Sequence, residues 1–318
     1  MLLKKNEGGH IMKKNILIFI LFIFVSILAG CGSKLENPEI KVYTRDTTSG
    51  TRDGFFSTIN FKDAVADNTA LVKGYVEVTG NGDMINLIKN DEYGIGYISL
   101  SSLENSGLKG LVYNAIDPTE ENVLNGTYLL TRNFNYVVRN EYNSTKVEEI
   151  VEAFVAYLNT KEGKTTIKAN DGIIAVNAND PSWNDIKSNY PIASEDNRGI
   201  TIRFGGSTSV EKIAKALSSE FSLKCGNFIY EHNHTGSGDA YKRTQGGEKD
   251  GSNKLDIAFA SREFKLSDTE LLSEGSYGKI CTDAIVAVVN NKNKITSITD
   301  ETLKSIYNGT ITKWNEVK

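Results

Sequence analysis

The stretch Tyr43–Phe56, which reads Y-T-R-D-T-T-S-G-T-R-D-G-F-F, decides the fold and the chemistry of this chain. Lys41–Thr44 is predicted to be a short strand, and the two closing phenylalanines to begin the buried face of a helix. Ser49 supplies N-cap chemistry, and Gly50 lets the backbone approach a ligand. Such a helix start presents unpaired N–H groups and the positive end of its dipole, and Arg45 is within reach. The stretch therefore predicts an anion site, with an ordinary capped helix as the alternative.

Two later stretches repeat this pattern. Ile200–Phe204 is a predicted strand that ends in Gly205–Ser209 and leads into a helix, and Phe228–Glu231 leads into Thr235–Asp239 and a second helix. A strand followed by a glycine-hydroxyl turn and a helix is an arrangement that binds oxyanions. The chain has no G-x-x-x-x-G-K-[ST] loop, and no G-x-S-x-G elbow surrounds Ser49, so neither a nucleotide hydrolase nor another enzyme is expected.

Length and charge narrow the class of protein further. A chain of 318 residues is long enough for two α/β lobes. Its formal charge is −4, and residues 1–30 hold four lysines against one glutamate, which leaves the remainder near −7. Nucleic-acid binding depends on neutralising phosphates, so no nucleic-acid partner is expected. An anion would have to be held by a local group of donors and not by the overall field.

The N-terminus has the pattern of an export signal. Met12–Asn15 is basic, Ile16–Ile27 is apolar and too short for a comfortable membrane span, and Leu28–Cys31 (L-A-G-C) resembles a bacterial lipobox. We therefore expect residues 1–31 to be a leader and lipoprotein signal with Met12 as the start, and Cys31 to carry a lipid anchor. A cleaved secretory signal with an incidental cysteine is the alternative.

Two cysteines and a histidine pair follow the signal. Cys225 and Cys281 are interpreted as two separate buried thiols, although the sequence does not exclude a disulfide. His232 and His234 alternate on a predicted strand and would face solvent; a metal site would need a third ligand, so none is expected. No cofactor is expected either.

Three further segments bear on the organisation and the site. Lys146–Leu158 has the apolar spacing of a helix, whereas Asn177–Asn197 is rich in Asn, Asp, Ser and Pro and is predicted to be a surface linker. Asp256 is a lone carboxylate at the start of the apolar strand in L-D-I-A-F-A-S-R-E. Local sequence leaves it open whether Asp256 is a cap, a partner of Arg262, or a functional group.

Several motifs together resemble the phosphate-binding lipoproteins of bacterial phosphate ABC transporters. They are R-D-T-T-S-G-T-R-D, I-G-Y-I-S-L, G-S-T-S-V, T-G-S-G-D, L-D-I-A-F-A-S-R-E, D-A-I-V-A-V-V-N and N-G-T-I-T-K-W-N-E-V, with Y-L-L-T-R where the family has Y-P-L-T-R. The resemblance covers nearly all of residues 39–176 and 199–318. The order differs, because the family begins with the G-S-T-S stretch, so the chain resembles a circularly permuted member.

The resemblance implies an α/β, two-lobed periplasmic-binding-protein fold of type II-like organisation, with the ligand cleft between the lobes. It implies a split lobe of residues 38–100 and 284–318 and a continuous lobe of 101–283, within which residues 177–197 join the family's usual termini. The permuted order predicts that Glu39–Tyr43 and Trp314–Lys318 lie side by side. It also predicts that Arg45 and Thr208 face each other across one cleft.

Carried over residue by residue, the resemblance implies a phosphate site formed by Arg45, Ser49, Gly50, Thr51, Thr208, Ser209, Ser237 and Asp256. Arg45 would be the cationic clamp, the hydroxyls would donate, and Asp256 would accept the proton of hydrogen phosphate and so exclude sulfate. Arg262 would support the site electrostatically.

The implied function is extracytoplasmic capture of inorganic phosphate by a monomer that is lipid-anchored to the cell membrane and delivers to the membrane permease of an ABC importer. Two alternatives remain open: a receptor for another oxyanion, or a non-transport surface or sensor protein or gene fragment of the same family.

Overall fold

The computed structural model describes residues 37–266 and 269–318, so the predicted signal and Cys31 lie outside the described residues. Residues 39–318 form one compact unit, and the fold described below is that of this unit. Within the described residues, no helix is long and apolar enough to cross a membrane.

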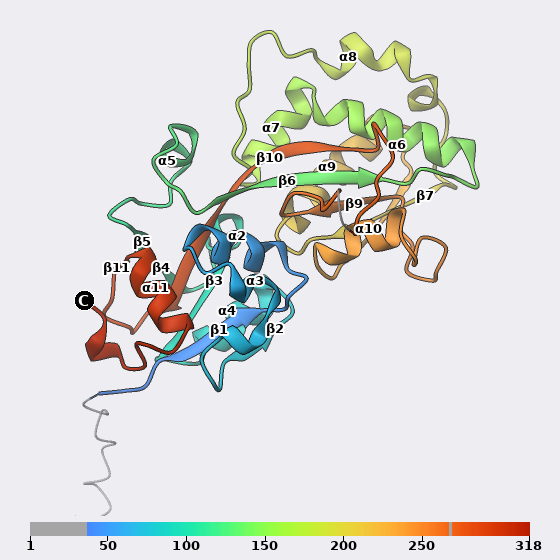
Figure 1. The fold of residues 1–318 in the computed structure, drawn as a ribbon. Coiled ribbons are helices and arrows are strands. Elements are labelled where there is room, and N and C mark those ends of the chain that lie inside the picture. Colours follow the sequence, from blue (N-terminus) through green and yellow to red (C-terminus); the bar gives the residue numbers. More distant parts are fainter. Residues whose placement is uncertain (1–36, 267–268) are drawn as a thin grey trace, which may run out of the picture. The chain divides into compact units, whose positions relative to one another are not determined.

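Residues 39–130 and 284–318 form one lobe, which we call the split lobe (Figure 1). Its helices and strands are β1 (Lys41–Arg45), α2 (Gly50–Thr58), α3 (Asp63–Ala66), β2 (Val76–Val78), α4 (Asn81–Lys89), β3 (Gly94–Ser99), β4 (Leu108–Gly110), β5 (Val112–Tyr113), α5 (Glu120–Leu124), β11 (Ser297–Ile298) and α11 (Asp300–Tyr307). Strands β1 and β2 are parallel, β1 also pairs with β3, and β5 pairs with β11.

Residues 131–283 form the other lobe, which we call the continuous lobe (Figure 1). Its helices and strands are β6 (Thr131–Val138), α6 (Thr145–Leu158), α7 (Lys161–Ala169), α8 (Trp183–Ile186), β7 (Thr201–Gly206), α9 (Glu211–Lys224), β8 (Ile229–His234), α10 (Gly238–Thr244) and β9 (Ile257–Ala260). Strand β7 runs parallel to both β8 and β9. Parallel pairing puts the C-terminal ends of β7 and β9 at the same edge of the sheet, where the turns that follow them meet.

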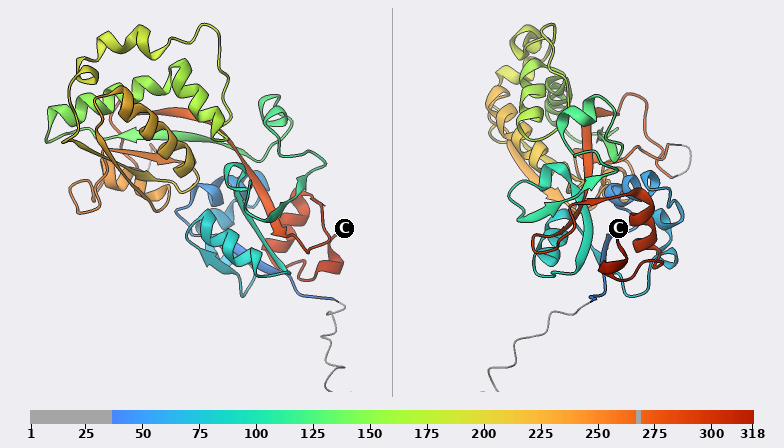
Figure 2. Two further views of the ribbon diagram at one scale, coloured as in Figure 1. Left: turned by 180° about the vertical axis from the view of Figure 1, so that it is seen from behind. Right: turned by 90° about the vertical axis from the view of Figure 1, so that its left-hand side faces the viewer.

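The long strand β10 (Tyr277–Asn290) passes through both lobes (Figures 1 and 2). Its first half pairs with β6, and its second half pairs with β3 and β4. In the second half, Ile285, Ala287 and Val289 face one core with α2 and α11, whereas Val286 and Val288 face another with α4. Alternation of this kind follows from the period of two in a strand.

The lobe boundary differs from the sequence prediction. Residues 101–130 were assigned to the continuous lobe, but β4 pairs with β10, and Tyr128 and Leu130 are buried in the core of the split lobe. The chain therefore passes between the lobes at Leu130–Thr131 and not after Leu100. The apolar residues of this segment gave no sign of which of the two cores they join.

The predicted surface linker of residues 177–197 is also corrected. It contains α8, and Trp183, Ile192 and Ala193 are buried against the core of the continuous lobe. Trp183 meets Tyr157 edge-on at 5.9 Å between ring centroids. A few large apolar anchors are enough to attach a segment whose composition is otherwise polar.

Three sequence predictions are confirmed: the neighbouring chain ends, one helix and two separate thiols. Glu39 and Lys313 form an antiparallel bridge, and the Ile40 N–H donates to the Thr312 carbonyl at 2.7 Å. The predicted helix at Lys146–Leu158 is present as α6. Cys225 and Cys281 are separate, buried and free, as predicted.

Candidate functional site

The N-terminus of α2 forms one wall of the candidate site, as the opening stretch predicted. Arg45 is the last residue of β1, and Ser49 caps α2 by accepting a hydrogen bond from the Arg52 N–H. Gly50 is required here, because a Cβ at this position would lie 2.8 Å from the Ser237 Oγ and from the Ser261 backbone. The first turn of α2 therefore packs directly against the continuous lobe.

The continuous lobe contributes three hydroxyl-bearing segments from the edge where its parallel strands end. Thr208 and Ser209 follow β7, Ser237 lies before α10, and Ser261 follows β9. The Ser207 N–H donates to the Phe259 carbonyl at 2.7 Å, which fixes the first segment to β9. All of the serines in these segments are nearly fully buried.

The predicted residues from the two lobes meet at Arg45. Its Nη2 lies 3.5 Å from the Thr208 Oγ1, and its Nη1 lies 3.5 Å from the Thr51 Oγ1. The Thr51 Oγ1 is in turn 3.2 Å from the Ser209 Oγ. The prediction that Arg45 and Thr208 face each other is thus confirmed.

Arg45 is incompletely satisfied by the protein. Its side chain is buried, its Nε has no hydrogen-bond partner, and the one short bond it donates goes from Nη2 to the Thr79 carbonyl at 2.8 Å. The contacts at 3.5 Å are longer than the 2.7–2.9 Å typical of charge-assisted bonds. Among the residues that the structure describes, no carboxylate forms an ion pair with Arg45. Burial lowers the Arg45 pKa, and the charge of Arg132 lowers it further.

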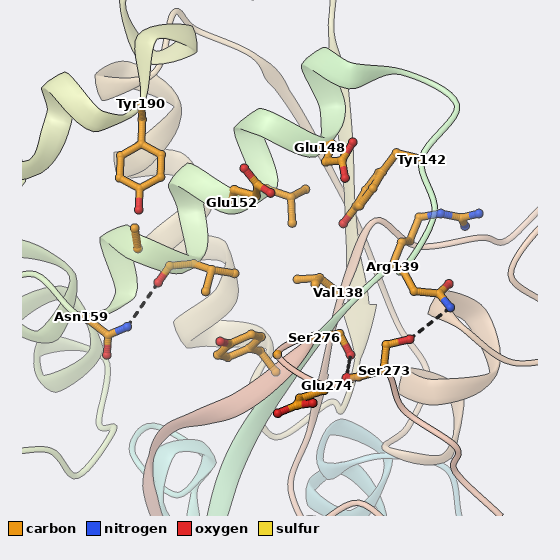
Figure 3. Close-up of a pocket in the computed structure, with 16 residues that line it drawn as sticks. Val138, Arg139, Tyr142, Glu148, Glu152, Asn159, Tyr190, Ser273, Glu274 and Ser276 are labelled. Atoms are coloured by element: carbon orange, nitrogen blue, oxygen red, sulfur yellow. Dashed lines mark hydrogen bonds between the residues drawn. The ribbon is translucent and has the colours of Figure 1, made fainter.

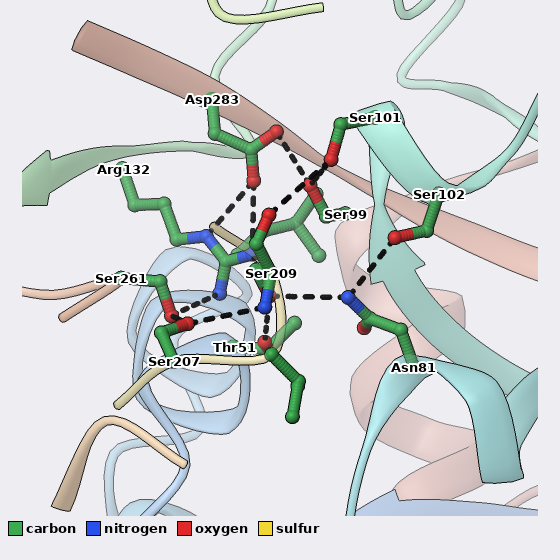
Figure 4. Close-up of polar contacts among 12 residues, drawn as sticks. Thr51, Asn81, Ser99, Ser101, Ser102, Arg132, Ser207, Ser209, Ser261 and Asp283 are labelled. Carbon is green, nitrogen blue, oxygen red and sulfur yellow. Dashed lines mark hydrogen bonds and ion pairs between the residues drawn. The ribbon is translucent and has the colours of Figure 1, made fainter. Parts of the chain in front are cut away.

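A second arginine, Arg132, donates hydrogen bonds to two of these hydroxyls (Figure 4). Its Nε and Nη2 donate to the Asp283 Oδ2 at 3.0 and 2.9 Å, its Nη2 also donates to the Ser209 Oγ at 2.9 Å, and its Nη1 donates to the Ser261 Oγ at 3.2 Å. Asp283 is fully buried and also accepts a hydrogen bond from Ser99 at 2.7 Å. Burial raises the Asp283 pKa, and Arg132 opposes that shift.

Asp256 does not belong to this group, which corrects the predicted site. It lies at the start of β9, and its Oδ2 accepts a hydrogen bond from the Arg203 N–H at 2.8 Å. Ser261, at the other end of β9, reaches the hydroxyls of Ser207 and Ser237. We call these three residues, together with Thr51, Thr208 and Ser209, the hydroxyl cluster. Five residue steps of extended chain separate Asp256 and Ser261 by about 16 Å. The motif placed a carboxylate beside the strand but did not indicate at which end the ligand lies.

Arg262 forms an ion pair with Glu270, which is not one of the predicted site residues. Its Nη1 and Nη2 form a two-bond ion pair with Glu270 at 2.9 and 2.7 Å. The bidentate geometry keeps the Arg262 guanidinium paired with Glu270. Arg262 is therefore not a free cation of the kind that the predicted electrostatic support of the site would need.

The histidine pair does not face solvent as predicted. His232 stacks on Phe204, the two histidine rings stack on each other, and the His234 Nδ1 lies 3.0 Å from the Ser207 carbonyl. Burial is the main cause that lowers the His232 pKa to about 4. No cluster of three or more metal-ligating side chains occurs in residues 37–266 and 269–318.

Five residues in or around the hydroxyl cluster were not predicted as site residues: Asn81, Arg132, Ser207, Ser261 and Asp283. Arg132, Ser207, Ser261 and Asp283 belong to motifs that carried the family resemblance, so their presence was visible but their contribution was not. Asn81 donates to the Ser209 Oγ at 3.2 Å from the start of α4, where the G-N-G-D sequence indicated only a helix start.

Two of the cavities in the described part of the chain bear on the choice of site. One of about 510 Å³ is lined by α2 and by Arg132 and Ser261, next to the cluster. Another, of about 630 Å³, lies along α6 in the continuous lobe, and Glu148, Glu152 and Glu274 are among its lining residues (Figure 3). Carboxylates repel an anion, and none of the predicted site residues lines the second cavity. The hydroxyl cluster around Arg45 is therefore the candidate anion site.

Comparisons with known proteins agree with this fold. The model of the PBP superfamily domain matches residues 191–318. The phosphate-binding protein PstS 2 of Streptococcus agalactiae serotype V is 27% identical over 316 residues, which cover 96% of this chain and 99% of the relative. PstS 2 of Streptococcus pneumoniae serotype 4 is 27% identical over 283 residues, 88% of each chain. Protein SphX of Synechococcus elongatus is 30% identical over 137 residues, 41% of this chain and 39% of the relative.

A solved structure shows the same architecture. The phosphate-binding protein of a phosphate ABC transporter from Streptococcus pneumoniae superposes with a TM-score of 0.61 at 24% identity, and the match covers 88% of this chain and 100% of that one. The long alignment with the S. agalactiae protein further means that the matched segments run in the same order in both chains. The chain therefore shares the fold of this binding protein and is similar in sequence to the streptococcal PstS 2 proteins.

Proposed function

We propose that this protein captures inorganic phosphate outside the cytoplasm and delivers it to the permease of an ABC importer. The observation that carries the proposal is the state of Arg45, a buried guanidinium whose Nε has no partner and which lies among the hydroxyls of Thr51 and Thr208. Leaving a buried charged donor unsatisfied is costly, so a ligand that supplies the missing acceptors is strongly favoured. A tetrahedral oxyanion has the charge and the oxygen geometry to do so.

Similar proteins support the identity of the ligand. The streptococcal relatives are phosphate-binding proteins, and the solved homologue belongs to a phosphate ABC transporter. Binding without chemistry is the role that fits, since the cluster consists of hydrogen-bond donors around a cation. Arg45, Ser49, Gly50 and Thr51 of the split lobe, with Thr208, Ser209 and Ser237 of the continuous lobe, would surround the ligand.

Calorimetric titration of residues 37–318 with phosphate tests this function. We expect one phosphate per chain and a rise in thermal stability with phosphate concentration, as binding to the folded state alone requires. Acetate, which is also an anion but planar and singly charged, is the matched control ligand. Heat from acetate equal to that from phosphate, or no heat from phosphate, would contradict the proposal.

We further propose that Cys31 anchors the protein to the extracytoplasmic face of the cell membrane and that the protein acts as a monomer. The support is the L-A-G-C sequence after the apolar stretch of residues 16–27. Expression of the full chain and of Cys31→Ala, followed by membrane fractionation and mass spectrometry of the mature N-terminus, tests the anchor. An unmodified N-terminus downstream of Cys31 would refute it.

A further inference from the structure

The hydroxyl groups of the site have a fixed hydrogen-bond direction, and Arg132 sets it. A hydroxyl carries one proton and can accept two hydrogen bonds. The Ser261 Oγ accepts from the Arg132 Nη1 at 3.2 Å and from the Ser207 Oγ at 3.0 Å, so both of its acceptor positions are filled (Figure 4). Its own proton is then left for the Ser237 Oγ, 3.0 Å away.

Ser237 completes this first chain. Its Oγ accepts from the Ser261 N–H at 2.9 Å as well as from the Ser261 hydroxyl. With both acceptor positions filled, Ser237 has only its proton to offer. Because Ser237 packs against Gly50 at the start of α2, that proton is available beside the helix N-terminus.

A second chain runs through Ser209. Its Oγ accepts from the Arg132 Nη2 at 2.9 Å and from the Asn81 Nδ2 at 3.2 Å, which leaves its proton for the Thr51 Oγ1. Thr51 also lies 3.5 Å from the Arg45 Nη1. The Ser209 hydroxyl fills one acceptor position of Thr51, so the Thr51 proton is available to donate to a ligand.

We propose that Arg132, held in place by Asp283, is a positioning residue that directs the Ser237 and Thr51 hydroxyl protons toward a ligand and leaves the site without a carboxylate to accept a ligand proton. The inference rests on the proposed function. It goes beyond it by naming the form of the ligand: the site takes the dianion of phosphate in preference to the monoanion, and it admits sulfate.

The reason is the number of protons on the ligand. The phosphate monoanion carries two O–H groups, the dianion one, and sulfate none. Each buried O–H without an acceptor costs about 1–3 kcal/mol, so the monoanion binds roughly five- to a hundredfold more weakly than the dianion. Asp283 cannot act as the acceptor, because it accepts two bonds from Arg132, one from Ser99 and one from the Ala284 N–H, which together fill its four acceptor positions.

The other charged groups near the site already contact residues of the protein. Asp46 and Asp83 act on Arg45 through their charges, and the Asp46 Oδ1 accepts from Thr48 while the Asp83 Oδ2 accepts from Thr79. His234 contacts the Ser207 carbonyl, and burial lowers its pKa, which keeps the ring neutral near pH 7.

Titration calorimetry with phosphate and with sulfate between about pH 5 and about pH 8 tests the inference. For the unsubstituted protein, we expect phosphate affinity to rise at least fivefold across this interval, whereas sulfate affinity stays constant because sulfate remains a dianion. The constant sulfate affinity shows that the ligand titrates and the protein does not. Arg132→Lys keeps the charge but cannot fill positions on both serines, so we expect phosphate affinity to fall at least tenfold and the pH dependence to flatten.

Arg139→Lys is the matched control, because Arg139 is also buried and paired with a carboxylate but lies at the far end of the continuous lobe. If Arg132→Lys does not fold, Ser261→Ala replaces it: without Ser261, the Ser237 hydroxyl is free to accept, and the pH dependence flattens. Phosphate binding that is independent of pH, or exclusion of sulfate, overturns the inference while the proposed function stands. Failure of the unsubstituted protein to bind either ion refutes the proposed function and this inference with it.

Discussion

Replacing Arg45 by glutamine should separate binding from stability. The guanidinium is buried, donates one short bond to the Thr79 carbonyl, and has three longer contacts at 3.5 Å, to Thr51, Asn81 and Thr208. Its Nε and Nη1 lack good partners within the protein, so a bound oxyanion would receive two charge-assisted hydrogen bonds from them. At about 1.5–3 kcal/mol for each such bond, Arg45→Gln should cost about 3–6 kcal/mol of phosphate binding, or about a hundred- to ten-thousandfold in affinity.

The stability of the ligand-free protein should change in a different way. Removing Arg45 takes away a buried charge that no described carboxylate neutralises, and this gain offsets the loss of the bond to Thr79. We expect the free energy of unfolding of Arg45→Gln to stay within about 1 kcal/mol of the unsubstituted protein. Arg139→Gln is the matched control, since Arg139 donates to the Asp250 carboxylate at 3.0 Å and to two carbonyls.

Calorimetric titration with phosphate and urea unfolding without phosphate measure the two quantities. The expected pattern is a crossed one: Arg45→Gln loses binding and keeps stability, and Arg139→Gln keeps binding and loses about 1–2 kcal/mol of stability. Phosphate affinity of Arg45→Gln within threefold of the unsubstituted protein would refute the reasoning. So would a loss of stability as large as that of Arg139→Gln, because Arg45 would then be a structural residue.

Three further outcomes follow from the structure. Asp256→Asn should leave phosphate affinity and the phosphate-to-sulfate ratio unchanged, because the carboxylate accepts from Arg203 at the far end of β9; calorimetry checks this. Trp183→Ala should cost about 3–5 kcal/mol in urea unfolding, since its ring is buried in the core, whereas a segment lying free on the surface would tolerate it. The His232 pKa is lowered from 6.5 to about 4, so the unfolded chain takes up this proton at higher pH than the folded one. Stability should therefore fall between those values as the pH falls, and His232→Gln should reduce that slope in unfolding curves.

The local sequence was sufficient to predict the strand-turn-helix units, whereas the meeting of Arg45 with Thr208 was predicted from the family resemblance. It was not sufficient for Asp256. A carboxylate next to a strand can lie at either end of the sheet, and only the parallel pairing of β7 with β9 shows that the site is at the end occupied by Ser261.

Arg132 and Asp283 illustrate a second limit. Their ion pair joins residues on β6 and β10 that are far apart in the chain, and nothing in either local sequence indicates the partner. The same applies to the lobe boundary, since Tyr128 and Leu130 would be buried in either core. Local patterns identify which residues are buried or polar, whereas long-range pairing decides what they contact.

The order of segments along the chain is of little consequence for the site, and the contacts at the two ends of the split lobe explain why. Glu39 is bridged to Lys313, and the Trp314 Nε1 donates to the Tyr93 carbonyl at 3.0 Å, so the first and last described segments belong to one layer of the same lobe. Joining two such neighbouring ends and breaking the chain at another loop changes mainly the loop-closure entropy, which varies slowly with loop length. Anion chemistry requires only that the turn after β1 meets the turn after β7. Since both turns are held by their own sheets, a chain with the same segments joined in another order would preserve every contact of Arg45, Thr51 and Ser209.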